Sequence, residues 1–226
     1  MKTTKVFTCT LCAALLFSGC NMNNTAKGGL IGGGGGALLG GIIGNIAGNT
    51  AVGAAIGGVV GAGAGVLIGK KMDKAKAAAA KVENAKVESV TDKNGLQAVK
   101  VTFDSGILFN LNKSNLSSSA KGALSKFSTV LMNNKDMDIV IYGHTDNTGS
   151  DAINNPLSLK RAQAVQSYLN QCGVSSVQTK EVLGKGSTEP IATNATREGQ
   201  AQNRRVEIYM YASENMIKSA NNGTLQ

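Results

Sequence analysis

The most informative segment of this chain is Asp138-Ile-Val-Ile-Tyr-Gly143, which is followed at once by His144-Thr-Asp146-Asn-Thr148-Gly149. The first half is strongly apolar, as expected of a buried strand. The second half has the Gly, Asn and Asp content of a loop. Asp146 therefore lies just beyond the C-terminal end of a strand, which is where the binding residues of α/β sheets tend to collect.

Strand and helix patterns surround this segment. Residues 96–103 alternate as a half-buried strand does, with Val99, Val101 and Phe103 on one face. Residues 117–133 carry apolar side chains at helical spacing, with residues 117–119 as candidate caps, and Pro156 is placed to open a second helix in its first turn. Residues 107–109, 178–184 and 205–211 predict further strands. The expected fold class is α/β: a compact α/β sandwich in which helices cover a mixed sheet.

Residues 1–19 have the layout of an export signal, with a positive start, an apolar run and then small residues before Cys20. The tetrapeptide Phe17-Ser-Gly-Cys20 resembles the lipobox of bacterial lipoproteins, which implies removal of residues 1–19 and attachment of lipid to Cys20. A plain secretory signal that happens to contain a cysteine is the alternative. Asn21 replaces the aspartate that retains enterobacterial lipoproteins at the inner membrane, which implies an outer-membrane location with residues 20–27 as the lipidated N-terminus.

Glycine recurs at every fourth position between Gly28 and Gly48, and again between Gly53 and Gly69. Residues four apart share a helix face, so each half would present a stripe without side chains against which a second helix can pack closely. Residues 28–69 therefore predict a glycine-zipper helical hairpin that inserts into the membrane or associates between copies. The alternative is a flexible glycine-rich spacer. The block resembles the glycine-zipper segments of several bacterial surface lipoproteins.

Composition separates the remaining segments. Residues 70–95 are rich in Ala, Lys and Glu and end at the turn signal Asn94-Gly95, so a helical linker is expected there. Residues 96–212 would form the α/β domain, and residues 213–226 a C-terminal tail. The 23 Lys and Arg against 14 Asp and Glu give a net charge of +9. This moderate excess does not indicate a nucleic-acid-binding protein, and the lysines after the zipper suit either anionic lipid head groups or simple solubility.

The α/β domain carries an ordered set of motifs. They are Gly143-His-Thr-Asp-Asn-Thr-Gly149, Asn154, Leu157-Ser-Leu-Lys-Arg-Ala162, Gly184-Lys-Gly186, Pro190, Asn194 and Asn203-Arg-Arg-Val-Glu207. In this order they are similar to the motifs of the OmpA-like peptidoglycan-binding domain family, over about residues 99–211. The resemblance implies that the domain binds peptidoglycan non-covalently through the diaminopimelate of the stem peptide.

The chemistry of two of these residues suits such a ligand. An amino-acid end of a wall peptide carries an ammonium and a carboxylate, and Asp146 and Arg161 together could hold both, since arginine offers a planar fork to a carboxylate. The resemblance implies the same two roles. The further ligand-binding positions that it implies are Thr148, Asn154, Arg204 and Asn110, the last standing where many family members have an aspartate. The alternative is an internal salt bridge between Asp146 and Arg161 that only fastens the helix to the sheet.

Catalysis is not expected, and neither is a cofactor or a metal. His144 stands beside Thr145 and Asp146, but neither a nucleophile nor a second metal ligand accompanies it, so we interpret it as a hydrogen-bonding residue of a turn. Arg204 and Arg205 would point to opposite faces of a strand and form no basic stripe for nucleic acid.

Together these features predict an outer-membrane lipoprotein whose C-terminal domain lies in the periplasm and tethers the membrane to the cell wall. Its partners would be peptidoglycan, the outer membrane and further copies of the chain, and not nucleic acid. The competing hypothesis is a stator or channel-type membrane component that uses the same wall-binding domain, as in flagellar motor proteins. Those proteins carry a longer apolar span with an acidic residue, whereas residues 28–69 contain no charge.

Overall fold

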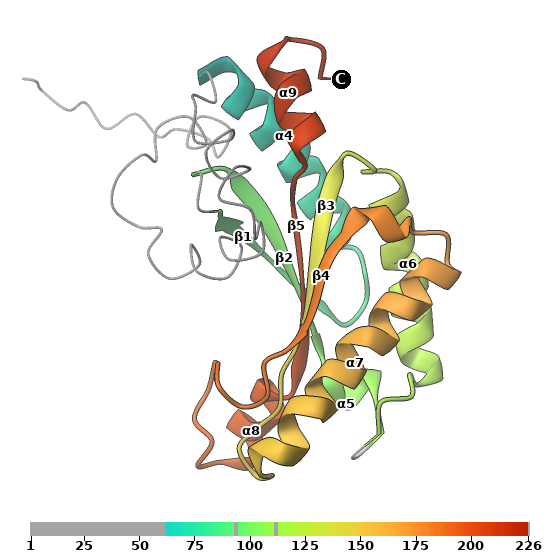
Figure 1. Cartoon of the computed structure of the whole chain (residues 1–226), viewed down its shortest axis with the longest axis vertical. Helices are drawn as coiled ribbons and strands as arrows, with labels where there is room; N and C mark the ends of the chain where they lie inside the picture. The colour runs from blue at the N-terminus through green and yellow to red at the C-terminus, as the bar shows by residue number, and fades with distance from the viewer. Residues whose placement is uncertain (1–61, 93–94, 111–112, 226) are drawn as a thin grey trace, which may run out of the picture.

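The computed structural model describes residues 62–92, 95–110 and 113–225, and these contain one sheet in the order β1-β2-β5-β3-β4 (Figure 1). The strands are β1 Ala85–Thr91, β2 Gln97–Asp104, β3 Met137–Gly143, β4 Thr179–Gly184 and β5 Arg205–Ala212. Neighbouring strands run antiparallel except β3 and β4, which are parallel. The predicted mixed sheet of an α/β domain is confirmed.

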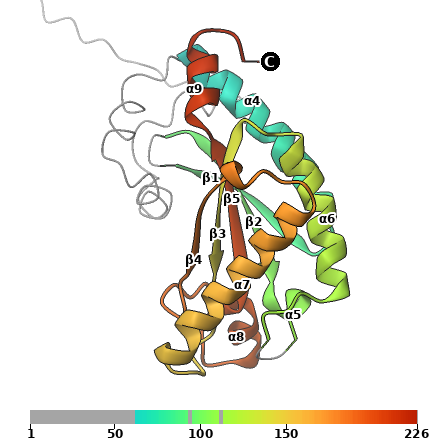
Figure 2. The same cartoon turned by 45° about the vertical axis from the view of Figure 1, so that its right-hand side comes forward.

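Long helices cover one face of this sheet, and shorter helices lie at its ends (Figures 1 and 2). They are α4 Ala62–Ala79, α5 Ser105–Leu108, α6 Ser118–Met132, α7 Asp151–Gln171, α8 Arg197–Asn203 and α9 Glu214–Asn221. The long helices α4, α6 and α7 pack along the same side of the strands, and the main core lies between them and the sheet (Figure 2). At its centre the rings of Phe103 and Phe127 meet edge to face, with centroids 5.8 Å apart.

Strand β2 shows how the alternation in the sequence divides the two faces. Val99, Val101 and Phe103 are fully buried in the main core, as predicted. Ala98 faces the other way and belongs to a second, smaller apolar cluster with Tyr142 and Tyr209. The sheet is therefore apolar on the helical side and mixed aromatic and polar on the other.

Helix α6 begins where the sequence predicted and α7 does not. The side chain of Ser117 accepts a hydrogen bond from the backbone N–H of Ala120, so Ser117 is the N-cap of α6. Helix α7 starts at Asp151, and Pro156 lies inside it. The prediction that Pro156 opens this helix is wrong. The extended Ser150 and an acidic first residue favour the earlier start, because a negative charge there complements the helix dipole.

The short strand predicted over residues 107–109 is also wrong. Residues Ser105–Leu108 form one helical turn, because the Asp104 carboxylate accepts a hydrogen bond from the backbone of Gly106 at 2.6 Å and caps that turn. Phe109 then makes a single antiparallel bridge to Leu116.

Residues 70–95 form the predicted helical linker only as far as Ala79. Helix α4 ends at Ala79, and residues 85–91 are an edge strand paired with β2 throughout. The sequence suggested a helix because Ala, Lys and Glu favour one, but pairing with β2 overrides that preference. Helix α4 is no spacer either, since Ile68, Met72 and Ala79 are fully buried in the main core.

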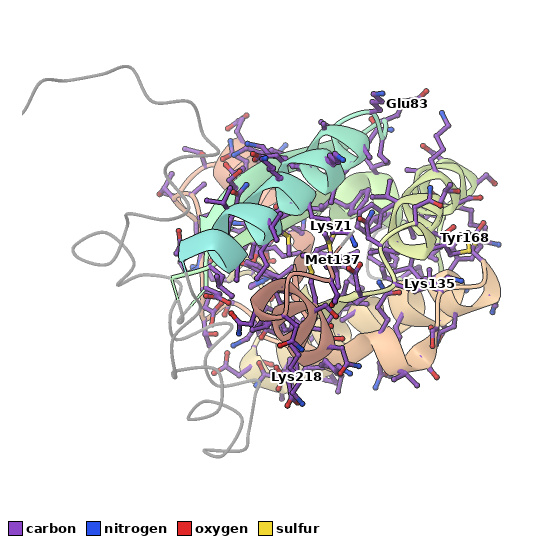
Figure 3. The ribbon with its side chains drawn as sticks, turned by 90° about the horizontal axis from the view of Figure 1, so that it is seen from above. Lys71, Glu83, Lys135, Met137, Tyr168 and Lys218 are labelled. Carbon is purple, nitrogen blue, oxygen red and sulfur yellow. The ribbon has the colours of Figure 1, made fainter. Side chains whose placement is uncertain are left out.

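The predicted C-terminal tail contributes a packed helix. In α9, Met216, Ile217 and Ala220 are buried against the main core, and α9 lies beside α4 over the end of the sheet (Figure 3). At the same end Lys71 of α4 forms an ion pair with Asp136, at 2.5 Å, just before β3 begins.

Other predictions fall largely outside the described residues. The signal peptide, Cys20 and residues 28–61 of the glycine zipper lie there, whereas residues 62–69 form the first turns of α4. Across the part of the chain that the structure describes, no helix combines the length and the apolar character needed to cross a membrane.

Candidate functional site

The loop that follows β3 is held by backbone contacts on two sides. His144 donates its backbone N–H to the carbonyl of Arg205 at 2.9 Å, and Thr145 donates to that of Gly186 at 2.8 Å. Gly143 and Gly184 stand opposite one another at the ends of β3 and β4. A side chain on either glycine would collide with α7, so these two residues let the helix close on the sheet and fix the loop beside it.

Asp146 is the buried acid of this loop, with its side chain only 6% exposed. Its Oδ1 accepts hydrogen bonds from both the backbone N–H and the hydroxyl of Thr148, at 3.0 and 2.5 Å. Its Oδ2 accepts from Nη1 of Arg204 at 2.5 Å. Burial alone would raise the pKa of Asp146, but the hydrogen bonds from Thr148 and Arg204 outweigh it and hold the pKa below the usual value of 3.8. Asp146 is therefore an ionised carboxylate at neutral pH.

Asn154 locks the loop onto the first turn of α7. Its side-chain amide donates to the carbonyls of Asp146 at 3.2 Å and of Gly149 at 2.8 Å. The residue is only 4% exposed. Its amide nitrogen is thus used to position Asp146, whereas Thr148 is exposed at the rim.

Arg161 lies two turns further along α7 and is also buried, at 4% exposure. Its Nε donates to the carbonyl of Lys113 at 3.1 Å, and its guanidinium lies over the ring of Phe109, 5.2 Å from the centroid. Within the described residues its two Nη atoms make no hydrogen bond. Burial and the nearby charge of Arg204 lower the pKa of Arg161, and the charge of Asp146 opposes them, so the three groups interact electrostatically.

Arg204 projects from the end of α8 on a firmly held backbone. The preceding residue, Asn203, is fully buried, and its side chain bonds to the backbone of Ile191 and Ala192. The Arg204 carbonyl accepts from the N–H of Ser105 at 2.9 Å. The Arg204 side chain remains 34% exposed, so this cation meets both Asp146 and solvent.

The structure brings five of the six predicted site residues together around the loop after β3, and Asn110 lies on a separate segment. The ion pair within this group differs from the alternative that the sequence left open. The alternative of an internal salt bridge between Asp146 and Arg161 is wrong, because the ion pair of Asp146 is made by Arg204. Burial directs Arg161 to a carbonyl and a ring on the segment before α6 instead. Asn110 is exposed on that segment, and its carbonyl accepts from the N–H of Lys113 at 3.0 Å.

Phe109 and Lys113 were missed by the sequence analysis, since neither belongs to a motif. Arg161 contacts the backbone carbonyl of Lys113 and the ring of Phe109 only because the fold brings this segment to α7, and no sequence pattern predicts such contacts.

A second polar cluster lies on the other face of the sheet. Glu207 is 2% exposed and is paired with Lys100 at 3.0 Å and Arg205 at 2.7 Å, and Tyr209 donates to it. His144 is 1% exposed, with Nε2 3.5 Å from Glu207, too long for a normal hydrogen bond. Among the described residues neither ring nitrogen of His144 has a hydrogen-bond partner. His144 is a hydrogen-bonding turn residue, as predicted, through its backbone N–H, which donates to Arg205. The described residues contain no cluster of metal ligands.

Two family models match the chain. Residues 108–204 match the OmpA family, and residues 1–73 match the YMGG-like Gly-zipper. The zipper match therefore extends into α4.

Curated relatives cover parts of the chain. Outer-membrane lipoprotein YfiB of Pseudomonas aeruginosa is 36% identical over 111 residues, which are 49% of this chain and 65% of YfiB. Outer membrane protein A of Bordetella avium is 36% identical over 124 residues, 54% of this chain and 62% of that protein. Peptidoglycan-binding protein ArfA of Mycobacterium tuberculosis is 55% identical over 73 residues, 32% of this chain and 22% of ArfA. The chain thus spans less than two thirds of the length of each of these relatives.

Solved structures share the fold. The cell wall anchor of the T6SS from Pseudomonas aeruginosa superposes with a TM-score of 0.52 at 28% identity, covering 63% of this chain and 97% of that one. A MotB-like protein from Desulfovibrio vulgaris gives a TM-score of 0.53 at 23% identity, covering 64% and 88%, which is a likeness of fold alone. Residues 108–204 are therefore an OmpA-family domain, and it follows a glycine-zipper segment of the YMGG-like type.

Proposed function

We propose that this protein binds peptidoglycan non-covalently at the loop after β3 and tethers the outer membrane to the cell wall. The observation that carries the proposal is the convergence of one buried carboxylate, Asp146, with two guanidinium groups, Arg161 and Arg204, inside an OmpA-family domain. Relatives named as a peptidoglycan-binding protein and as a cell wall anchor support the same ligand class.

The ligand end is the diaminopimelate of the stem peptide, which offers an ammonium and a carboxylate on one carbon. Asp146 takes the ammonium, and Arg161 takes the carboxylate with the Nη atoms that its contact to Lys113 leaves available. In the complex each carboxylate has a cationic partner, because the ligand ammonium pairs with Asp146 and the ligand carboxylate pairs with the guanidinium groups. Thr148 and Asn110 contact the ligand from the exposed rim, and Asn154 contributes by positioning Asp146.

The membrane side of the tether is lipid on Cys20 together with the glycine-zipper segment, with the OmpA-family domain in the periplasm. More than one acyl chain is needed for stable anchoring, and lipoprotein processing supplies several. Mass spectrometry of the mature N-terminal peptide tests this part, since an unmodified Cys20 would remove the anchor.

Pull-down of the detergent-solubilised chain on purified peptidoglycan tests the wall-binding part. We expect Asp146→Ala and Arg161→Ala to weaken retention by about 30-fold or more, because each leaves a buried ligand charge without its partner. Arg161→Lys should also bind poorly, since the charge survives but the bidentate fork does not.

Matched controls are Glu214→Ala on the exposed start of α9 and Arg197→Ala on α8, which remove the same charges outside the loop that follows β3. Melting temperatures of all variants separate lost binding from lost folding. A well-folded Arg161→Ala protein that is still retained would overturn the proposal.

A further inference from the structure

We infer that Arg204 is an exchangeable counter-ion of Asp146, which makes the site select ligands that carry an ammonium and a free carboxylate together. The inference rests on the proposed function and concerns the specificity of the same site. A ligand ammonium takes the place of Arg204 on Asp146, and the displaced guanidinium turns to the carboxylate of that ligand beside Arg161.

The carboxylate of Asp146 is already occupied. Thr148 donates twice to Oδ1, Arg204 holds Oδ2, and only 6% of the Asp146 side chain is exposed. A second cation would have to share an oxygen with a guanidinium in a buried position, where like charges repel strongly. If the ammonium replaces Arg204 on Asp146, this repulsion is avoided, whereas binding of the ammonium beside Arg204 would create it.

Of the residues that hold Asp146, Arg204 is the one able to leave. Thr148 is bound to Asp146 partly through its own backbone, which the loop fixes. The Arg204 backbone is also fixed, but its side chain is 34% exposed and makes its one ion pair in the described structure with Asp146. Its guanidinium can therefore move into solvent or toward a ligand without disturbing α8.

Displacement of Arg204 from Asp146 by a ligand ammonium is unfavourable when the ligand has no carboxylate. Arg161 is buried nearby, and the charge of Arg204 already lowers its pKa. Once an ammonium replaces Arg204 on Asp146, Arg204 loses its carboxylate partner and the buried Arg161 gains none, unless the ligand supplies a carboxylate. An amine whose carboxylate is absent or converted to a carboxamide therefore binds weakly, because Arg204 competes with it and gains nothing in return.

Binding of diaminopimelate and of its diamide, in which both carboxylates are carboxamides, tests the exchange by calorimetry on the detergent-solubilised chain. We expect the wild-type protein to prefer the free acid by at least about tenfold. Arg204→Gln should bind the acid more weakly than wild type does, but should bind the diamide more tightly, because no resident cation has to be displaced. Arg204→Lys, which keeps an exchangeable cation, should retain the low affinity for the diamide.

Arg197→Ala is the matched control, because it removes an exposed arginine from the same helix and should leave both affinities unchanged. A gain in diamide affinity in Arg204→Gln alone supports exchange. If Arg204→Gln weakens both ligands or leaves both unchanged, Arg204 is an ordinary contact or a structural residue and the inference fails. If the wild-type protein binds neither ligand and no peptidoglycan, both the proposed function and the inference fail. If it binds diaminopimelate but Arg204→Gln does not bind the diamide more tightly than wild type does, only the inference fails.

Discussion

Two glycines, Gly143 and Gly184, set the geometry of the candidate site by letting α7 approach the sheet closely. A Cβ on Gly143 would lie 2.1 Å from the carbonyl oxygen of Ser158, and one on Gly184 would lie 2.5 Å from the backbone nitrogen of Leu159. Both obstacles are backbone atoms of α7, which cannot move without shifting the helix that carries Asn154 and Arg161. The absence of a side chain here therefore sets the distance between sheet and helix, and through it the geometry of the site.

Gly143→Ala should lower the free energy of unfolding by about 1–3 kcal/mol, because the added methyl group overpacks the contact between β3 and α7. Gly122→Ala is the matched control. Gly122 lies in α6 with nothing within 4 Å of the added atom, so alanine should stabilise the protein by about 0.5–1 kcal/mol through its higher helix propensity. Urea unfolding of both variants measures the difference, and equal effects of the two would contradict this account.

His144 illustrates a buried base beside a buried acid. Burial lowers the pKa of His144, and Arg205 adds to this, while Glu207 opposes it. Burial alone would raise the pKa of Glu207, but the positive charges of Arg205 and Lys100 bring it well below the usual value. Glu207 is thus ionised and balanced by two permanent cations, and His144 is neutral at pH 7.

The depressed pKa of His144 predicts a loss of stability in mild acid. As the pH falls below about 6.5, the unfolded chain takes up a proton that folded His144 does not, so the free energy of unfolding falls by at most about 1.4 kcal/mol per pH unit. His144→Gln lacks this group, and the chain has one histidine. Its stability should therefore vary less between pH 8 and 5.5. Parallel curves for the two proteins, followed by thermal unfolding, would show that His144 does not titrate as proposed.

At the scale of helices and strands, α4 is packed into the domain more closely than its composition suggests. Lys70 and Lys74 are exposed, yet Ile68 and Met72 are fully buried and the helix also packs against α9. The ion pair of Lys71 with Asp136 and the hydrogen bond from Gln97 to Asp73 add polar contacts. Helix α4 is thus a structural part of the folded domain, although the match to the Gly-zipper model reaches residue 73.

Met72→Ala should destabilise the domain by about 2–5 kcal/mol, since it leaves a cavity among buried side chains. The exposed Lys74→Ala on the same helix should change stability by no more than about 0.5 kcal/mol. Denaturant unfolding monitored on the α/β domain distinguishes the two. Equal stability of Met72→Ala and wild type would mean that α4 is a dispensable spacer.

In the molecule as a whole, the two functions proposed for this chain lie at opposite ends of the sheet. The described chain enters at α4, beside α9 and the start of β3, whereas the loop after β3, which carries Asp146, begins at the other end of the sheet, near α7 and α8 (Figure 1). A strand of 7 residues spans roughly 23 Å. The proposed wall-binding site is therefore at the end of the domain opposite to the start of α4, an arrangement that suits the proposed tether.

Local patterns were sufficient for much of this protein. The apolar run ending at Gly143, the alternation around Val101 and the cap at Ser117 predicted β3, β2 and α6, because periodicity and capping act within a few residues. The motif order predicted the OmpA-like fold and brought Asp146, Arg161 and Arg204 to attention. These features depend on the order of residues along the chain, so they can be predicted from the sequence.

Contacts between distant segments required the fold itself. The edge strand β1 exists because β2 offers it backbone partners, and α4 and α9 are ordered by burying apolar side chains against each other and the core. The sequence could not predict the ion pair of Asp146 for the same reason: Arg204, 58 residues away, reaches it, while Arg161 contacts Phe109 and Lys113. Whether Arg161 or Arg204 pairs with Asp146 depends on the burial of each guanidinium and on the space around it. Both are properties of the packed chain, so they cannot be predicted from the sequence.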